Sequence, residues 1–192
     1  MSTTQPIKNR TEIEQLKNYY YKEKPNLRNY TLICLGINSA LRISDLLELK
    51  WKDVYCFSEK HFLKHIQIFE KKTGKYNQVA LNTNALEALT TYKKTLSSLT
   101  PDDYLFPGKD SCCHLSRSQA FRIIKTAGDQ LHFETEISCH SLRKTFGYHA
   151  WKAGVAPAVL MAIFNHSSYH ITKRYLGINQ DDKDNVFLKI NL

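Results

Sequence analysis

The stretch from His140 to Gly154 reads HSLRKTFGYHAWKAG, and it predicts a helix from about Cys139 to Lys152 that Gly154 ends. His140 and Arg143 are three positions apart, so they share one face of that helix. Attack on a phosphodiester needs both a group that transfers protons and a fixed positive charge. Alone, the H-x-x-R pattern is equally typical of a surface histidine beside a salt-bridged arginine, so the rest of the chain has to decide.

Composition sets the outer limits. A chain of 192 residues is long enough for one well-buried core, and we predict a single domain over residues 1–192. The net charge of +9 is spread along the chain and favours nucleic acid as the partner, although a generally solvated basic protein has the same balance. The sequence has neither an apolar run of membrane-spanning length nor an apolar secretion segment, so we expect a cytoplasmic protein without membrane contact. With nucleic acid as its partner, it would be nucleoid-associated.

The five cysteines indicate free thiols in a reducing compartment, because their number is odd and no CxxC pair occurs. The run Cys112-Cys113-His114 resembles part of a metal site. Adjacent cysteines rarely direct both sulfurs at one ion, however, and the sequence offers no second pair. We therefore expect neither a metal nor a cofactor.

Periodicity predicts a mainly α fold with one small three-stranded antiparallel β-sheet inserted early. The sheet is expected within residues 54–81, with a hairpin at Lys72–Lys75. Capping boxes at Thr11–Glu14 and Ser116–Gln119 mark two helix starts. Helices are expected near 12–22, 27–38, 44–49, 82–96, 116–131, 139–152, 157–164, 169–176 and 182–190.

Arg42 lies among apolar residues in ALRISDLLELKW, where an arginine must be paired or directed at an anion. Asp45 is the obvious partner, three residues further on. The same carboxylate could instead orient Arg42 toward a phosphate, because a guanidinium can serve both groups through different N–H bonds.

Five motifs follow one another in a fixed order: ALRISDLL, then KKTGKY, then HSLR, then NHSS, then a tyrosine nine residues after the histidine. This ordered set resembles the catalytic domain of the tyrosine recombinase (phage integrase) family over about residues 5–180. The resemblance implies the fold of the DNA breaking-rejoining enzyme catalytic core. It also implies an active site made of six residues: Arg42, Lys72, His140, Arg143, His166 and Tyr175.

The resemblance gives each of these residues a role that the chemistry supports. Arg42 and Arg143 would stabilise charge on the non-bridging phosphate oxygens, and His166 would be a further donor. The phenol of Tyr175 would be the nucleophile and needs a base, for which His140 is the candidate.

The leaving 5′ oxygen needs a proton, and in this family a hairpin lysine gives it. Lys72 occupies that place, while Lys71 and Lys75 are close alternatives. The implied product is a 3′-phosphotyrosyl link to DNA, which keeps the bond energy so that rejoining needs neither ATP nor a metal.

The chain departs from the family pattern in two ways. Asn165 stands where members commonly have glycine, although asparagine tolerates a left-handed backbone. The preceding core-binding domain that clamps DNA is missing, so we expect either a short free-standing recombinase or a catalytic fragment. The family also implies a synaptic tetramer on double-stranded DNA, possible accessory DNA-bending proteins, and a segment 181–192 exchanged between protomers through the stripe Val186, Phe187 and Ile190. That stripe would equally suit packing on its own core.

The sequence thus predicts a site-specific DNA recombinase or integrase that cleaves and rejoins strands through Tyr175. Two alternatives stay open: a non-catalytic DNA-binding regulator derived from a recombinase, and an enzyme that relaxes DNA as type IB topoisomerases do. A more distant one is a helical protein whose basic face binds RNA or acidic protein.

Overall fold

The computed structural model of the chain describes residues 4–110, 112–177, 184 and 187–190, apart from the side chain of Arg174. Its elements are α1 (Arg10–Asn18), a π-helical turn (Tyr19–Glu23), α2 (Leu27–Asn38), α3 (Ile43–Leu47), a 3₁₀ turn (Trp51–Asp53), β1 (Tyr55–Cys56), β2 (His61–Phe62), β3 (His65–Phe69), β4 (Tyr76–Ala80), α4 (Thr83–Lys93), α5 (Arg117–Gln130), α6 (Cys139–Lys152), α7 (Pro157–Phe164) and α8 (Tyr169–Tyr175).

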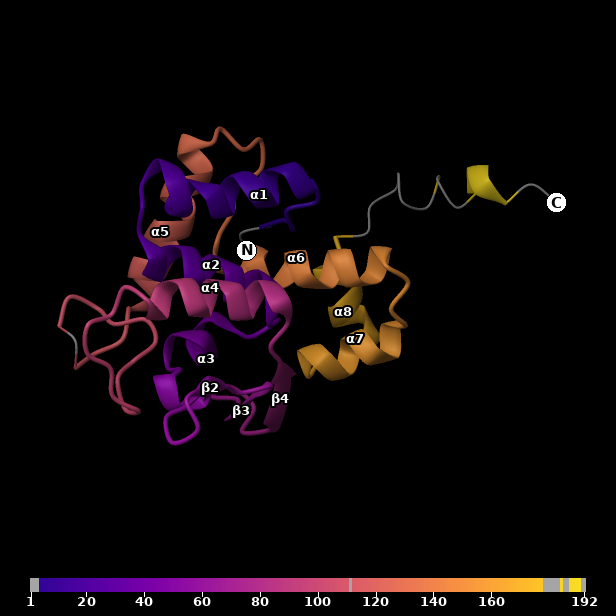
Figure 1. Cartoon of the computed structure of the whole chain (residues 1–192). Coiled ribbons are helices and arrows are strands. Elements are labelled where there is room, and N and C mark those ends of the chain that lie inside the picture. The colour runs from indigo at the N-terminus through magenta and orange to yellow at the C-terminus, as the bar shows by residue number, and fades with distance from the viewer. Residues whose placement is uncertain (1–3, 111, 178–183, 185–186, 191–192) are drawn as a thin grey trace.

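Helix α2 is the central element of the fold, and it packs against α1, α4 and α6 (Figure 1). Asn26 caps its start by accepting a hydrogen bond from the backbone N–H of Asn29. Almost every following residue up to Ile37 is buried, which explains why its apolar residues occur on all sides. Gly36 allows α6 to approach closely, because a Cβ there would lie 2.6 Å from Leu142 Cδ1.

Helices α6, α7 and α8 form the other side of the molecule (Figure 1). They pack on one another around a small cluster that includes Leu160, Phe164 and Leu176. Gly147 of α6 is essential to this contact, since a Cβ there would lie 2.7 Å from Phe164 Cζ. Among the helices of the described residues, none has both the length and the apolar character of a membrane span.

The prediction of one three-stranded sheet was wrong, because the strands form two separate antiparallel pairs. Within the part of the chain that the structure describes, β1 pairs only with β2 and β3 only with β4. In the second pair, His65 lies opposite Ala80 and Phe69 opposite Tyr76. Lys60, with φ of 55°, lies in the turn between β1 and β2. The predicted hairpin at Lys72–Lys75 is confirmed as the connection between β3 and β4.

Most predicted helices are confirmed within a few residues, and the start of the first helix differs from its prediction. The first helix begins at Arg10, because Asn9 rather than Thr11 is the cap and accepts from the Thr11 N–H at 2.8 Å. Of the predicted helix near 182–190, residues 182, 183, 185 and 186 lie outside the described residues, and residues 187–189 are helical. Of its predicted apolar stripe, Phe187 and Ile190 are described and exposed, while Val186 is not described.

Candidate active site

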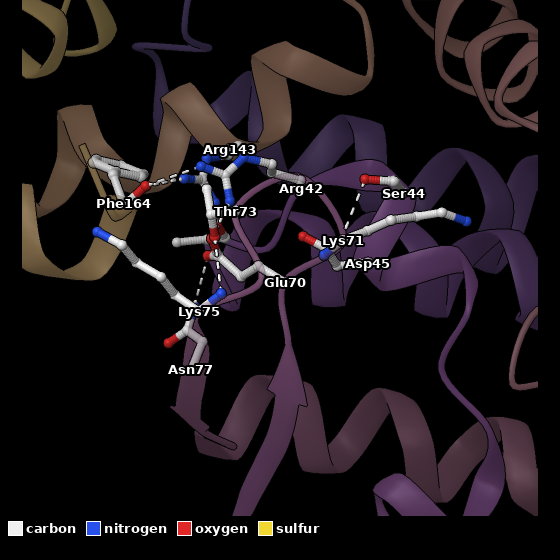
Figure 2. Close-up of polar contacts among 11 residues, drawn as sticks. Arg42, Ser44, Asp45, Glu70, Lys71, Thr73, Lys75, Asn77, Arg143 and Phe164 are labelled. Carbon is white, nitrogen blue, oxygen red and sulfur yellow. Dashed lines mark hydrogen bonds and ion pairs between the residues drawn. The ribbon is translucent and has the colours of Figure 1, made fainter. Parts of the chain in front are cut away.

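Two arginines from distant parts of the chain meet at the end of α7. Arg42 immediately precedes α3, and Arg143 lies in α6 with 2% of its surface exposed. Both guanidinium groups donate to the carbonyl oxygen of Phe164, Arg143 through Nη2 at 2.7 Å and Arg42 through Nη2 at 3.4 Å (Figure 2). The last carbonyls of a helix lack partners within the helix and carry partial negative charge, so they attract cations.

The backbone on either side of these acceptors takes an unusual conformation. Arg143 Nη1 donates to the carbonyl of Ala40, a residue with φ of 54°. Asn165, directly after Phe164, is left-handed with φ of 51° and ψ of 40° and ends α7. The sequence predicts that asparagine is acceptable in place of glycine here. The structure shows Asn165 in the left-handed conformation, which asparagine tolerates.

The expected pairing of Arg42 with Asp45 was wrong, because Arg42 Nη1 forms its ion pair with Glu70 (Figure 2). Asp45 instead accepts the backbone N–H of Lys71 at 3.0 Å, so it fixes the start of the β3–β4 turn. Sequence reasoning missed Glu70. It lies next to two lysines in a segment that looks like a solvated hairpin, and only the fold shows that it is 1% exposed.

Tyr175, the last residue of α8, points its hydroxyl at His140, the second residue of α6. The hydroxyl hydrogen-bonds His140 Nε2, and the two rings meet edge to face with centroids 4.9 Å apart. Arg143 lies near the same phenol, with its Cζ 6.0 Å from the ring centroid. The structure therefore brings together the predicted nucleophile, its candidate base and a buried arginine.

His166 also lies against Tyr175, with ring centroids 4.5 Å apart. Its ring stacks on Phe164 at 5.1 Å, and its Nδ1 is 3.0 Å from the hydroxyl oxygen of Thr172. Thr172 is fully buried, so its contact fixes the orientation of the imidazole and leaves Nε2 for another partner.

Burial and positive charge decide the protonation of these groups. Desolvation, together with Lys144, Arg143, Arg42 and Lys72, lowers the pKa of His140 to about 4. Desolvation and the two arginines likewise lower the pKa of His166 to about 4. At neutral pH both imidazoles are neutral, which is the form that a general base must have.

The pKa values of Tyr175 and Arg143 move in ways that suit their predicted roles. Desolvation raises the pKa of Tyr175, although Arg143 and Arg42 oppose that rise, so the phenol keeps its proton until a base removes it. Burial and the charge of Arg42 lower the pKa of Arg143 to about 10, so it stays charged at neutral pH.

The three hairpin lysines differ in where their charges act. Lys71 Nζ pairs with Glu48, and Figure 2 shows this side chain extending away from the arginines. Lys75 extends toward the Phe164 side of the arginines in the same view. The charge of Lys72 reaches His140 strongly enough to contribute to its lowered pKa. Among the three lysines, Lys72 is thus the one whose charge acts on the His140–Tyr175 pair.

A possible metal-ligand group lies outside this cluster. Within the described residues, Cys56, Glu59 and His61 on the β1–β2 hairpin have one potential ligand atom each, all within 4.8 Å of one another. The sequence analysis did not single them out. The active-site cluster itself consists of cationic and imidazole groups around a phenol, a set suited to binding an anion.

Comparisons with known proteins identify a family for this chain. Residues 9–181 match the model of the phage integrase family. The probable integrase/recombinase YoeC of Bacillus subtilis is 38% identical over 181 residues, which cover 94% of this chain and 93% of that protein. The type 1 fimbriae regulatory protein FimE of Escherichia coli K12 is 28% identical over 155 residues, covering 79% of this chain and 75% of FimE.

Solved structures show the same fold. The XerA recombinase superposes with a TM-score of 0.78 at 22% identity, over 98% of this chain and 65% of XerA. The XerH recombinase bound to its difH substrate gives 0.73 at 18% identity, over 93% of this chain and 51% of XerH. The chain therefore spans between half and two thirds of these two structures. It belongs to the phage integrase family, and further relatives are named tyrosine recombinases.

Proposed function

We propose that this chain cleaves and rejoins double-stranded DNA at specific sites through a covalent link between Tyr175 and a 3′ phosphate. The observation that carries this proposal is the hydrogen bond between the Tyr175 hydroxyl and His140 Nε2, next to the buried guanidinium of Arg143. A non-catalytic DNA-binding protein has no need for a phenol held against an unprotonated imidazole.

The first step is an in-line attack of the Tyr175 oxygen on the phosphorus. The phenolic proton passes to His140 Nε2, the new O–P bond forms, and the bond from phosphorus to the 5′ oxygen breaks. Lys72 gives a proton to the departing 5′ oxygen. Rejoining runs the same steps backwards with a 5′ hydroxyl as the attacking group, so no external energy source is needed.

The arginines stabilise the charge that builds up on the non-bridging oxygens. Arg42 and Arg143 are held by carbonyl and carboxylate groups before any substrate binds, so little reorganisation is required when the phosphate arrives. Neutral His166 donates from Nε2 in the tautomer in which its Nδ1 accepts the Thr172 hydroxyl. Each preorganised donor of this kind is typically worth about 10²–10³ in rate.

We further propose that the active form is a tetramer assembled on DNA, with segment 181–192 exchanged between neighbouring protomers and possible help from DNA-bending proteins. The exposed side chains of Phe187, Leu188 and Ile190 support this arrangement, since apolar groups of this size gain from being covered. Because the proposed substrate is DNA, its place of action would be the nucleoid in the cytoplasm. The same proposal covers two forms of the active protein: this chain alone, and this chain with a preceding DNA-clamping domain.

A covalent-trap assay tests the function directly. Wild type and Tyr175→Phe are incubated with nicked duplexes drawn from DNA that flanks the gene, and the products are separated on a denaturing protein gel. We expect a DNA-shifted band for wild type only, with the DNA attached at Tyr175. Equal DNA binding by both proteins without a shifted band would point to a regulator, or to the need for a clamping domain, which a fusion to such a domain would then reveal.

A second assay, on a supercoiled plasmid, separates strand exchange from relaxation. After the covalent band is established, wild type is given a supercoiled plasmid with two candidate sites. Recombinant products support the proposed function. Relaxed plasmid without exchange would support the topoisomerase-like alternative.

A further inference from the structure

Glu70 joins three parts of the active site through one buried carboxylate. Its Oε2 pairs with Arg42 and accepts the Thr73 hydroxyl at 2.7 Å, and its Oε1 accepts Asn77 Nδ2 at 3.1 Å (Figure 2). The side chain of Asn165 is close enough to this carboxylate to help lower its pKa. The groups that meet at Glu70 therefore come from the start of α3, the β3–β4 hairpin and the loop after α7.

The backbone of Glu70 closes the turn that carries Lys72. Its N–H donates to the Lys75 carbonyl at 2.9 Å, and its own carbonyl accepts from Thr73 N–H at 3.2 Å and from Gly74 N–H at 2.7 Å. Gly74 has φ of 66°, so the turn uses a left-handed residue to close. A change at Glu70 is thus placed to affect Lys72 as well as Arg42.

The carboxylate is charged in spite of its burial. Burial by itself would raise the pKa of Glu70, but hydrogen bonds from Asn165, Thr73 and Arg42 and the charge of Arg42 outweigh it and lower the pKa. A buried anion beside a phosphate-binding arginine weakens the positive charge of the site. The ion pair with Glu70 nevertheless fixes the orientation of the Arg42 guanidinium, which could otherwise take several orientations.

We propose that Glu70 is a positioning residue for strand cleavage, which holds the Arg42 guanidinium in place and couples it to the Lys72 hairpin and to the loop that carries His166. This inference rests on the proposed cleavage function. Glu70 does not touch the phosphate in this scheme. It acts through Arg42 first, since that contact is an ion pair, and through the hairpin second.

The test compares Glu70→Gln with Glu48→Gln. Both variants make the same chemical change at a glutamate paired with a cation near the hairpin, but Glu48 is exposed and contacts Lys71 rather than Arg42. We expect single-turnover cleavage to fall about 10- to 100-fold for Glu70→Gln, with DNA affinity within about threefold of wild type, because a small misplacement of a catalytic group costs rate more than binding. Glu48→Gln should stay within about twofold.

A substrate with sulfur in place of the leaving 5′ oxygen shows through which group Glu70 acts. Sulfur departs without a proton, so this substrate removes the need for Lys72. We expect the deficit of Glu70→Gln to persist on it, while that of Lys72→Ala disappears. Full recovery of Glu70→Gln would overturn the assignment to Arg42, and equal cleavage by Glu70→Gln and wild type on normal DNA would overturn the proposal altogether.

Guanidinium NMR gives a readout that does not depend on cleavage. Rotation of the Arg42 guanidinium should be slow in wild type and in Glu48→Gln and fast in Glu70→Gln; equal rotation in all three would refute the positioning role. If wild type forms no covalent complex, the proposed function fails while this measurement still tests Glu70. Should Glu70→Gln not fold, Thr73→Val removes one bond to the same carboxylate and keeps its charge. We expect that variant to cleave about three- to tenfold more slowly, and wild-type cleavage by it would count against the coupling to the hairpin.

Discussion

Replacing Arg143 by lysine should separate catalysis from stability. The Arg143 guanidinium bridges two main-chain acceptors, the carbonyl oxygens of Ala40 and Phe164, while 2% of the residue is exposed. A lysine ammonium keeps the charge but is a compact group that cannot reproduce this planar fork. At least one buried carbonyl then loses its partner.

The two effects differ in size. Leaving one buried acceptor unpaired costs about 1–3 kcal/mol of the free energy of unfolding. A domain of this size has roughly 5–15 kcal/mol, so nearly all molecules of the variant stay folded at 25 °C. Loss of correctly placed donors at the phosphate, by contrast, should slow cleavage by about 10²–10³. The loss of activity therefore cannot come from unfolding.

Urea unfolding followed by circular dichroism measures the first quantity, and single-turnover formation of the covalent complex measures the second. Arg122→Lys is the matched control, because Arg122 is exposed and both quantities should stay near wild type. The reasoning would be refuted if Arg143→Lys cleaved DNA at the wild-type rate, or if its activity fell only in proportion to the unfolded fraction.

Three further predictions test the site in other ways. The pKa values of His140 and His166 are lowered to about 4, below the unfolded value near 6.5, so their contribution to stability is complete above about pH 6.5 and is lost as the pH falls toward 4. The urea midpoints at pH 5 and pH 7 should therefore differ less in His140→Gln and in His166→Gln than in wild type. An unchanged difference between the two midpoints would contradict this prediction. Asn165→Val should reduce the free energy of unfolding by about 1–2 kcal/mol, because position 165 has a left-handed backbone, whereas Asn165→Gly should stay within about 1 kcal/mol of wild type. Equal losses for the two variants in thermal or urea unfolding would argue against a backbone cause. Gly147→Ala should displace the Phe164 ring and lower the free energy of unfolding by about 1–3 kcal/mol. It should also slow formation of the covalent complex at a temperature where the variant is folded. A wild-type rate would show that the two arginines do not depend on the position of that ring.

Local sequence signals predicted the helices well because the signals and the structures are both local. Ser116 and Gln119 form the expected capping box, and Gly154, with φ of 86°, follows the end of α6 as expected. The strands were harder to predict, since alternation shows that a segment is extended but not which partner it finds. This is why two separate hairpins were taken for one sheet.

The candidate site shows the same division. Residue types and order were enough to select Arg42, His140, Arg143, His166 and Tyr175, and the structure brings these five together. The partner of Arg42 could not be predicted from spacing. The nearest acid in sequence, Asp45, binds the Lys71 backbone, while the true partner comes from 28 positions away.

The holding of Arg143 by main-chain oxygens has a consequence for how this site tolerates variation. No single side chain can be deleted to remove either acceptor, so the contact is protected against most substitutions. It is instead sensitive to backbone conformation, because Ala40 is left-handed itself and Phe164 precedes left-handed Asn165. In a survey of functional variants, positions 40 and 165 should therefore accept glycine readily and exclude β-branched residues. Such a pattern would look like chemical selectivity, although its origin is the path of the chain.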